Sequence, residues 1–213
     1  MKTAIFDLDG TIADTIKDLA DAVNHGLKQL GCPEHSVEKY KKMVGNGARK
    51  LCLRALPDSR KSEAETLHGL FRAYYDIHYL ENTKLYPGIK PTIEQLSVNG
   101  VEIAVATNKP QDTAIKVLKN LLPDINFYKI LGGCDDRPKK PDPTIIREIL
   151  SGLPTDNKVF MIGDSNVDIQ TAKNAGLISI GCLWGFRSRA ELETEGADFI
   201  AESADDILNF ILR

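Results

Sequence analysis

Short apolar runs alternate with stretches of helical periodicity along most of the chain. The first run, Thr3 to Phe6, carries no charge and predicts a strand that is buried on both faces. Similar runs predict further strands at Val101 to Ala106, Phe127 to Leu131, Val159 to Ile162, Ile178 to Leu183 and Asp198 to Ile200. Helices are predicted between them at Ile89 to Val98, at Gln111 to Leu122, at Pro143 to Leu150, through Ala172 up to Gly176, and from Ala204 onward. This alternation predicts an α/β fold, with a Rossmann-like, mainly parallel sheet and helices on both faces.

One long stretch departs from the alternation and reads as helical throughout. Apolar residues recur at helical spacing from Ile16 to Leu30, Val37 to Met43, Gly47 to Leu56 and Ser62 to Leu80, with no convincing strand among them. Tyr86-Pro87-Gly88 marks its end. We therefore expect residues 14–85 to form a small inserted all-α cap, and residues 1–13 and 86–213 to form the catalytic core. An insertion directly after the first strand would lie over the strand ends as a lid.

Composition excludes several classes of function. The 213 residues are 42% hydrophobic and 27% charged, and the net charge of -3 gives no attraction to nucleic acid or anionic membranes. No apolar run is long enough to span a bilayer, and no signal peptide precedes the first acids, so we expect a cytoplasmic protein. The four scattered cysteines suggest reduced, buried thiols and no zinc site.

Two carboxylates follow the first strand, separated by one residue. Asp7 and Asp9 would lie at the carboxyl end of a parallel strand, where open α/β sheets bind their ligands. Two acids this close repel one another when both are ionised. A hard divalent cation is the simplest group that would hold them together.

Three more predicted strand ends carry polar groups. Thr107 and Asn108 combine a hydroxyl and an amide before a helix, which suits an anionic oxygen, although helix capping is the alternative. Lys139 and Lys140 lie on a proline-rich loop, which would hold an ammonium near a phosphoryl group or would simply be a solvated charged loop. Gly163-Asp164-Ser165-Asn166-Val167-Asp168 places two acids across a strand-to-helix turn, and helix capping by Asp164 or Ser165 is the alternative.

The positions of these motifs in the predicted sheet support a common site. Each of them ends a predicted strand, so one cleft would gather them all. Asp7 and Asp164 would then form a site of carboxylate oxygens suited to Mg²⁺, which keeps waters and bridges to phosphate.

Together the motifs resemble those of the haloacid dehalogenase superfamily of phosphohydrolases. The resemblance implies that Asp7 is the nucleophile that forms an aspartyl-phosphate, and that Asp9 is the general acid and base. Thr107, Asn108 and Lys140 would bind or neutralise the phosphoryl group, with Lys140 preferred to Lys139 because it begins Lys-Pro-x-Pro. It further implies that Mg²⁺ is held by the side chains of Asp7 and Asp164 and by the backbone carbonyl of Asp9, with Asp168 and Thr11 supporting the site.

Four segments carry a closer resemblance: Val44-Gly45-Asn46-Gly47-Ala48, Arg54-Ala55-Leu56, Tyr86-Pro87-Gly88 and Trp184-Gly185-Phe186-Arg187-Ser188. They are similar to segments of the phosphoglycolate phosphatase branch, and the helical insertion resembles its small α-helical cap. Gly45, Asn46 and Gly47 form a turn whose amides would suit a substrate carboxylate, and Arg49 or Arg54 would add charge. A plain turn and solvated arginines are the alternative for these residues.

The resemblance implies a Mg²⁺-dependent phosphatase, phosphoglycolate phosphatase-like, acting on a small phosphorylated metabolite with 2-phosphoglycolate as the first candidate. Alternatives on the same fold are a pyrophosphatase, a sugar-phosphate phosphatase and a β-phosphoglucomutase-like enzyme. A non-catalytic binding protein is the alternative from another class. We expect a monomer or homodimer with no nucleic-acid or membrane partner.

Overall fold

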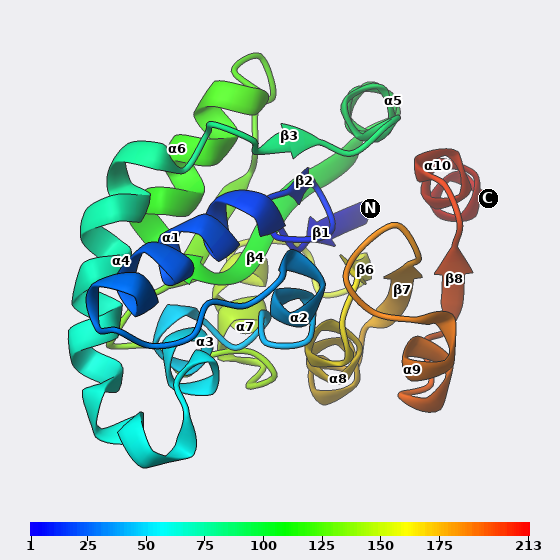
Figure 1. The fold of residues 1–213 in the computed structure, drawn as a ribbon. Coiled ribbons are helices and arrows are strands. Elements are labelled where there is room, and N and C mark those ends of the chain that lie inside the picture. Colours follow the sequence, from blue (N-terminus) through cyan, green and yellow to red (C-terminus); the bar gives the residue numbers. More distant parts are fainter.

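Six parallel strands form one sheet in the computed structural model, which describes residues 1–213. Their order across the sheet is β5-β4-β1-β6-β7-β8, so the first strand of the chain lies near its centre (Figure 1). All neighbouring pairs are parallel, which confirms the predicted sheet and its six strands. The strands are β1 (Lys2–Phe6), β4 (Val101–Pro110), β5 (Lys129–Gly133), β6 (Lys158–Gly163), β7 (Ile178–Cys182) and β8 (Phe199–Ala201).

Helices cover both faces of this sheet. Successive strand residues point to opposite sides, so the apolar strands have two hydrophobic faces to bury. Phe6 packs with residues of α5, α6 and α10, whereas Ile5 packs on the other face with residues of α7 and α8. Both side chains are fully buried. The helices of this part of the chain are α5 (Ile89–Val98), α6 (Gln111–Leu121), α7 (Thr144–Leu150), α8 (Asn166–Ala175), α9 (Arg189–Thr194) and α10 (Ala204–Leu212).

The helices that follow β1 have a hydrophobic cluster of their own, and we call them the helical unit. Its members are α1 (Ile16–Gln29), α2 (Val37–Lys41), α3 (Ala48–Ala55), the 3-10 helix η1 (Asp58–Glu63) and α4 (Ala64–His78). The long helices α1 and α4 lie side by side and supply much of the cluster (Figure 1). Tyr40 of α2 and Leu67 of α4 are fully buried in it. The helical unit therefore packs around a core separate from the two that flank the sheet.

Asp18 joins the two ends of the helical unit. Its buried carboxylate accepts hydrogen bonds from the backbone N–H groups of Asn82 (2.9 Å) and Thr83 (2.9 Å) and from both side chains. Beside it, β2 (Ala13–Asp14) and β3 (Lys84–Leu85) pair as a short antiparallel ladder. These contacts fasten the segment that leaves the sheet to the segment that returns to it.

Several local expectations were wrong. The sequence predicted no strand between residues 14 and 85, whereas the structure has the β2–β3 ladder at the two ends of this stretch. Strands of two residues are too short to show an alternation of apolar and polar positions, so the pattern could not reveal them. The helix α9 was not predicted, because Leu192 is its only buried residue and six residues show no clear periodicity. Cys134 is exposed in the loop after β5, whereas Cys32, Cys52 and Cys182 are buried thiols as expected. No helix combines the length and apolar character that crossing a bilayer requires.

Candidate active site

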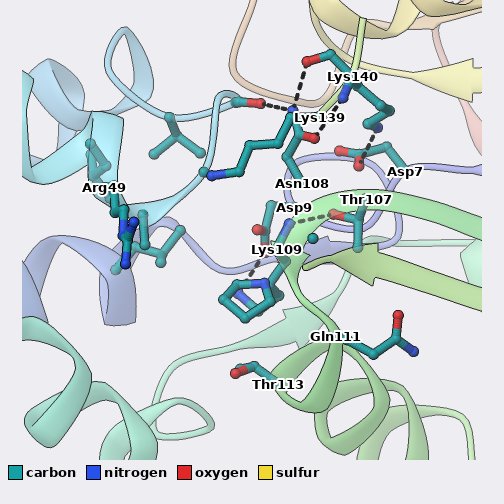
Figure 2. Close-up of a pocket in the computed structure, with 18 of the residues that line it drawn as sticks. Asp7, Asp9, Arg49, Thr107, Asn108, Lys109, Gln111, Thr113, Lys139 and Lys140 are labelled. Carbon is teal, nitrogen blue, oxygen red and sulfur yellow. Dashed lines mark hydrogen bonds and ion pairs between the residues drawn. The ribbon is translucent and has the colours of Figure 1, made fainter. Parts of the chain in front are cut away.

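A cavity of about 770 Å³ lies between the carboxyl ends of the strands and the helical unit. Its lining comes from both sides: Asp7, Thr107 and Asp164 from the strand ends, and Gly45 and Arg49 from the helical unit. Arg49 lies across the cavity from Asp7 (Figure 2). The predicted strand-end residues therefore meet in one cleft, as their placement required.

Lys140 is the centre of the hydrogen-bond network on the strand side. Its ammonium donates to Asp7 Oδ1 (2.8 Å), to Asp168 Oδ1 (2.7 Å) and to the Ala106 carbonyl (2.7 Å), so all three of its hydrogens are used. The side chain is only 2% exposed. Figure 2 shows Lys140 directly beside Asp7. A buried ammonium held by three acceptors is a fixed positive charge next to the Asp7 carboxylate.

Burial shapes the charge of this network. It raises the pKa of Asp7 to about 7, since the attraction of Lys140 only partly offsets desolvation and Asp168 and Asp9 add repulsion. Burial alone would lower the pKa of Lys140, but Asp168 and Asp7 outweigh it and raise that pKa. The pKa of Asp164 is raised well above its usual value, first by burial and then by Asp168 and Asp7. The site thus holds more negative charge than its own lysine balances.

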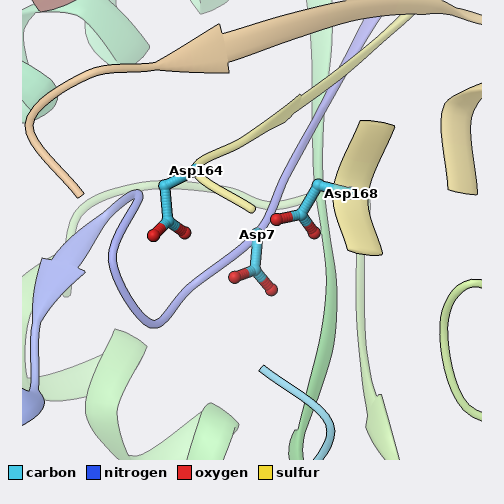
Figure 3. Close-up of side chains that lie close together, drawn as sticks. All are labelled: Asp7, Asp164 and Asp168. Carbon is cyan, nitrogen blue, oxygen red and sulfur yellow. The ribbon is translucent and has the colours of Figure 1, made fainter. Parts of the chain in front are cut away.

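Three carboxylates converge at this point. Oxygens of Asp7, Asp164 and Asp168 lie within 4.8 Å of one another, and all three residues are buried (Figure 3). Glycines make the approach possible, because a Cβ on Gly10 would lie 2.4 Å from Asp164 Oδ2 and one on Gly163 would lie 2.2 Å from Asp168. The group is a potential cation site with oxygen ligands.

The three carboxylates differ in how much of their acceptor capacity is left. Asp168 gives one oxygen to Lys140 and the other to the backbone N–H and hydroxyl of Ser165, in a capping box that starts α8. Asp164 accepts single bonds from Thr11 Oγ1 (3.2 Å) and the Phe186 N–H (2.7 Å), one on each oxygen. Asp7 Oδ2 accepts none. Asp7 and Asp164 therefore fit a divalent cation better than Asp168. The helix capping expected of Asp164 or Ser165 is performed by Ser165, with Asp168 as its partner in the capping box, and Asp164 takes no part in it.

Asp9 points away from this cluster. Its Oδ1 accepts hydrogen bonds from Thr15 Oγ1 (2.8 Å) and from Lys109 Nζ (3.0 Å). Lys109 also donates to the hydroxyl of Tyr75 on α4 (2.8 Å). Sequence reasoning assigned nothing to Lys109 and Tyr75. Lys109 directly follows Thr107 and Asn108 in the sequence, but no local pattern connects it with a tyrosine in the helical unit.

Thr107 and Asn108 are both buried at the end of β4, and they differ in what they leave available. The Asn108 amide donates to the carbonyls of Gly45 (2.9 Å) and Lys140 (3.1 Å) and accepts from the Lys140 N–H (2.9 Å). It thus holds the Lys140 loop and the Gly45 turn in place. Thr107 Oγ1 accepts from the Lys109 N–H (3.2 Å), and its own hydrogen is donated to no protein atom. The assignment of both residues to phosphate stays a prediction.

On the helical-unit side, Gly45, Gly47 and Arg49 line the cavity, whereas Asn46 and Arg54 do not. Arg54 donates to the Met43 carbonyl (2.6 Å) and to Asn46 Oδ1 (2.7 Å), so it braces the turn. Further cations line the cavity. The sequence assigned no ligand role to Arg72, Lys116, Arg137 and Arg187, and it placed Lys139 below Lys140. The pKa of His68 is lowered by burial and by Arg49, which places a half-buried, neutral imidazole near these cations. We call the exposed side chains of Arg49, Arg72 and Lys139 the rim of the cavity, and their positive charge suits an anion.

The chain was compared with known protein families, curated proteins and solved structures. Residues 4–182 match the family model described as haloacid dehalogenase-like hydrolase. A phosphoglycolate phosphatase from Vibrio parahaemolyticus is 33% identical over 219 residues, which cover 99% of this chain and 96% of that protein. A phosphoglycolate phosphatase from Aquifex aeolicus is also 33% identical, with 99% of this chain and 97% of the relative covered.

Solved structures give the same result. A crystal structure from Lactobacillus delbrueckii subsp. bulgaricus superposes with a TM-score of 0.92 at 32% identity, covering 99% of this chain and 98% of the other. CbbY from Rhodobacter sphaeroides in complex with phosphate superposes with a TM-score of 0.73 at 25% identity, covering 97% and 96% of the two chains. With its strand-end carboxylates, its buried lysine and a family match over most of its length, the chain belongs to the haloacid dehalogenase-like hydrolases.

Proposed function

We propose that this hydrolase is a Mg²⁺-dependent phosphomonoesterase and that 2-phosphoglycolate is its substrate. The observation that carries the proposal is the state of Asp7. One of its oxygens is fixed by Lys140 at 2.8 Å, and the other has no protein partner and belongs to a side chain that lines the cavity. The relatives named phosphoglycolate phosphatase support the choice of substrate.

The proposed reaction has two steps. The free oxygen of Asp7 attacks phosphorus, the bond between phosphorus and the ester oxygen breaks, and Asp9 gives a proton to the departing alcohol. Asp9 then takes a proton from a water that attacks the aspartyl-phosphate, which releases inorganic phosphate and restores Asp7. Lys140 offsets the repulsion between an anionic nucleophile and an anionic phosphate. Thr107 donates its free hydroxyl hydrogen to a phosphoryl oxygen.

The donor set fits Mg²⁺, which prefers carboxylate oxygens and retains several waters. Asp164 and Oδ1 of Asp7, which keeps a lone pair beside its hydrogen bond from Lys140, would hold the ion together with the backbone carbonyl of Asp9. Oδ2 of Asp7 then stays free for the attack, while Asp168 and Thr11 keep the surrounding groups in place. When bound, the ion supplies positive charge against the phosphoryl oxygens. The raised pKa values of Asp7 and Asp164 support this assignment, because they mark buried carboxylates whose negative charge the protein compensates only in part.

Substrate selection is assigned to the helical unit. In this proposal residues 14–85 act as a cap over a core of residues 1–13 and 86–213. The carboxylate of 2-phosphoglycolate would lie against the positive rim, with Arg49 and the backbone of Gly45 and Gly47 as its nearest candidates. Asn46 and Arg54 would shape the turn from behind.

A substrate panel tests the proposal. Phosphate release is measured with Mg²⁺ and with excess chelator on 2-phosphoglycolate, sugar phosphates, nucleotides, pyrophosphate and p-nitrophenyl phosphate. We expect metal-dependent release with the highest kcat/KM for 2-phosphoglycolate. A clear preference for pyrophosphate or a sugar phosphate would show that this compound, and not 2-phosphoglycolate, is the substrate. Absence of release from every compound would support a non-catalytic binding protein instead.

A further inference from the structure

Lys109 is a buried charge that the proposed reaction leaves without a role. It is the last but one residue of β4, and its side chain is 2% exposed. Burying an ammonium is costly unless acceptors compensate it. Here the compensation comes from Asp9 Oδ1 at 3.0 Å and from the Tyr75 hydroxyl at 2.8 Å, with the Tyr75 ring centre 4.8 Å from Nζ. Such a costly arrangement next to a reactive carboxylate suggests a function there.

The hydrogen bonds to Asp9 are asymmetric. Thr15 Oγ1 and Lys109 Nζ both donate to Oδ1, at 2.8 and 3.0 Å, and no protein group donates to Oδ2. Two donors on one oxygen fix the rotation of the carboxyl group. They also leave Oδ2 as the oxygen without a protein donor, and therefore as the one that is available to a reacting group in the cavity.

Lys109, which contacts Asp9, connects two parts of the molecule through its second hydrogen bond, to Tyr75. Lys109 belongs to the sheet, whereas Tyr75 belongs to α4 of the helical unit. Figure 2 shows Lys109 next to Asp9 at the end of the strand. Tyr75 is buried and makes no other side-chain hydrogen bond, so its hydroxyl is devoted to Lys109. The position of Lys109, and through it that of Asp9, therefore depends on contact with the helical unit.

We propose that Lys109 is a positioning residue that holds Asp9 with Oδ2 ready for proton transfer, and that Tyr75 holds Lys109 in place when the helical unit lies against the sheet. The proposal rests on the proposed function, in which Asp9 is the general acid. Lys109 itself is given no contact with the reacting atoms.

The test uses two substrates that differ in their need for an acid. The alkoxide that leaves an alkyl phosphate, such as 2-phosphoglycolate or the best alkyl phosphate of the panel, must be protonated, whereas nitrophenolate leaves p-nitrophenyl phosphate without a proton. The readout is kcat/KM, which covers the steps up to departure of the leaving group. A merely structural role for Lys109 would lower both values equally.

The variants are Lys109→Met, which removes the ammonium, and Tyr75→Phe, which removes only the hydroxyl. Tyr74→Phe is the matched control, because it makes the same change one residue earlier on α4, where the ring stacks on His25 and His78 and the hydroxyl makes no hydrogen bond. Asp9→Asn gives the reference for complete loss of the acid. Thermal unfolding of each variant is followed by circular dichroism, and Tyr75→Phe decides the matter if Lys109→Met does not fold.

We expect kcat/KM for the alkyl phosphate to fall on the order of 10- to 100-fold in Lys109→Met and about 3- to 10-fold in Tyr75→Phe, within the range of acid–base catalysis. The value for p-nitrophenyl phosphate should change less than about 3-fold, and Tyr74→Phe should match the wild type. Equal losses on both substrates, or none, while Asp9→Asn loses selectively, would overturn the role of Lys109 alone. If Asp9→Asn itself shows no selectivity, the acid role of Asp9 fails, and the positioning role fails with it.

Discussion

The two sides of the cavity are built differently. On the strand side, Asp7, Lys140, Asp164 and Asp168 are each less than 9% exposed. Lys140 bonds Asp7 and Asp168 at 2.8 and 2.7 Å, and Asp164 is held separately by Thr11 and the Phe186 N–H. On the helical-unit side, the side chain of Arg49 is 58% exposed, and its one ion pair, to Glu65, is 3.8 Å long. Long ion pairs between exposed side chains contribute little to stability. The strand side is thus fixed before substrate arrives. The charges of the rim, in contrast, remain free to pair with the substrate.

This difference matches two chemical tasks. Stabilising the charge that develops on a phosphoryl group needs groups that are already in place and shielded from water. Recognising the rest of the substrate needs only charge of the right sign at the right distance. Substitutions on the strand side should therefore have large effects on rate and stability, and substitutions on the rim should have smaller effects on binding.

The largest effect is expected at Lys140. Lys140→Met removes the only ammonium that contacts Asp7 and Asp168, so kcat should fall on the order of 10³-fold. The two carboxylates would stay buried without their partner, which typically costs about 3 to 5 kcal/mol. Urea unfolding in the absence of metal measures the second quantity, and phosphate release measures the first.

Lys139→Met is the matched control, one residue earlier on the same loop. Lys139 is exposed and forms no ion pair in the structure, so its loss should leave the free energy of unfolding nearly unchanged. If Lys140→Met and Lys139→Met were equally stable and equally active, the proposed contrast between the strand side and the rim would be wrong.

The second prediction concerns pH. The pKa of Asp7 is about 7 in the folded protein and 3.8 in the unfolded chain, so between these values the folded state retains a proton that the unfolded state has released. This contribution to stability is therefore lost as pH rises from about 4 to about 7. Asp7→Asn lacks it. A difference of about three in pKa corresponds to about 4 kcal/mol. In chelator, the Tm of Asp7→Asn relative to wild type should therefore rise by roughly 10 °C across that window.

Added Mg²⁺ should reduce this pH-dependent difference, because a cation bound at Asp7 favours the ionised carboxylate of the wild type. Differential scanning fluorimetry from pH 4 to 8, with chelator and with Mg²⁺, provides the comparison. A difference in Tm that does not change with pH in chelator would show that Asp7 is ionised throughout.

The smallest effect is expected on the rim. Arg49→Gln should raise KM for 2-phosphoglycolate about 10-fold with little change in kcat, because a charged hydrogen bond to substrate is lost. KM for p-nitrophenyl phosphate, which has no carboxylate, should change much less. Arg54→Gln is the control, since Arg54 braces the turn outside the cavity. A larger rise in KM for Arg54→Gln than for Arg49→Gln would reverse the assignment.

The same contrast explains what the sequence predicted well. The strands are short, mainly apolar runs, and parallel strands place their carboxyl ends on one edge, so Asp7, Thr107 and Asp164 were expected to meet, as they do. The sequence also predicted that a helix ends at Gly176, because glycine commonly ends helices. In the structure α8 does end there, and Gly176 adopts the left-handed conformation (φ 69°) that glycine favours.

What could not be predicted depends on contacts between distant segments. Lys109 and Tyr75 are 34 residues apart and meet only because α4 lies over the end of β4. Arg49 and Arg54 are alike in sequence, and only the direction of each side chain from α3 separates a cavity residue from a brace. Asn108 was expected at the phosphate, but nothing local revealed that its amide would be taken up by Gly45 and Lys140.

The most direct test of the central claim is the rate of phosphate release from 2-phosphoglycolate by wild type and by Asp7→Asn, side by side in Mg²⁺. Asparagine keeps the shape of the side chain and removes the nucleophilic oxygen. We expect the wild type to turn over and the folded variant to be slower by at least about 10³-fold, as is typical when a covalent nucleophile is removed. A folded Asp7→Asn protein that released phosphate at the wild-type rate would contradict the assignment of Asp7 as nucleophile.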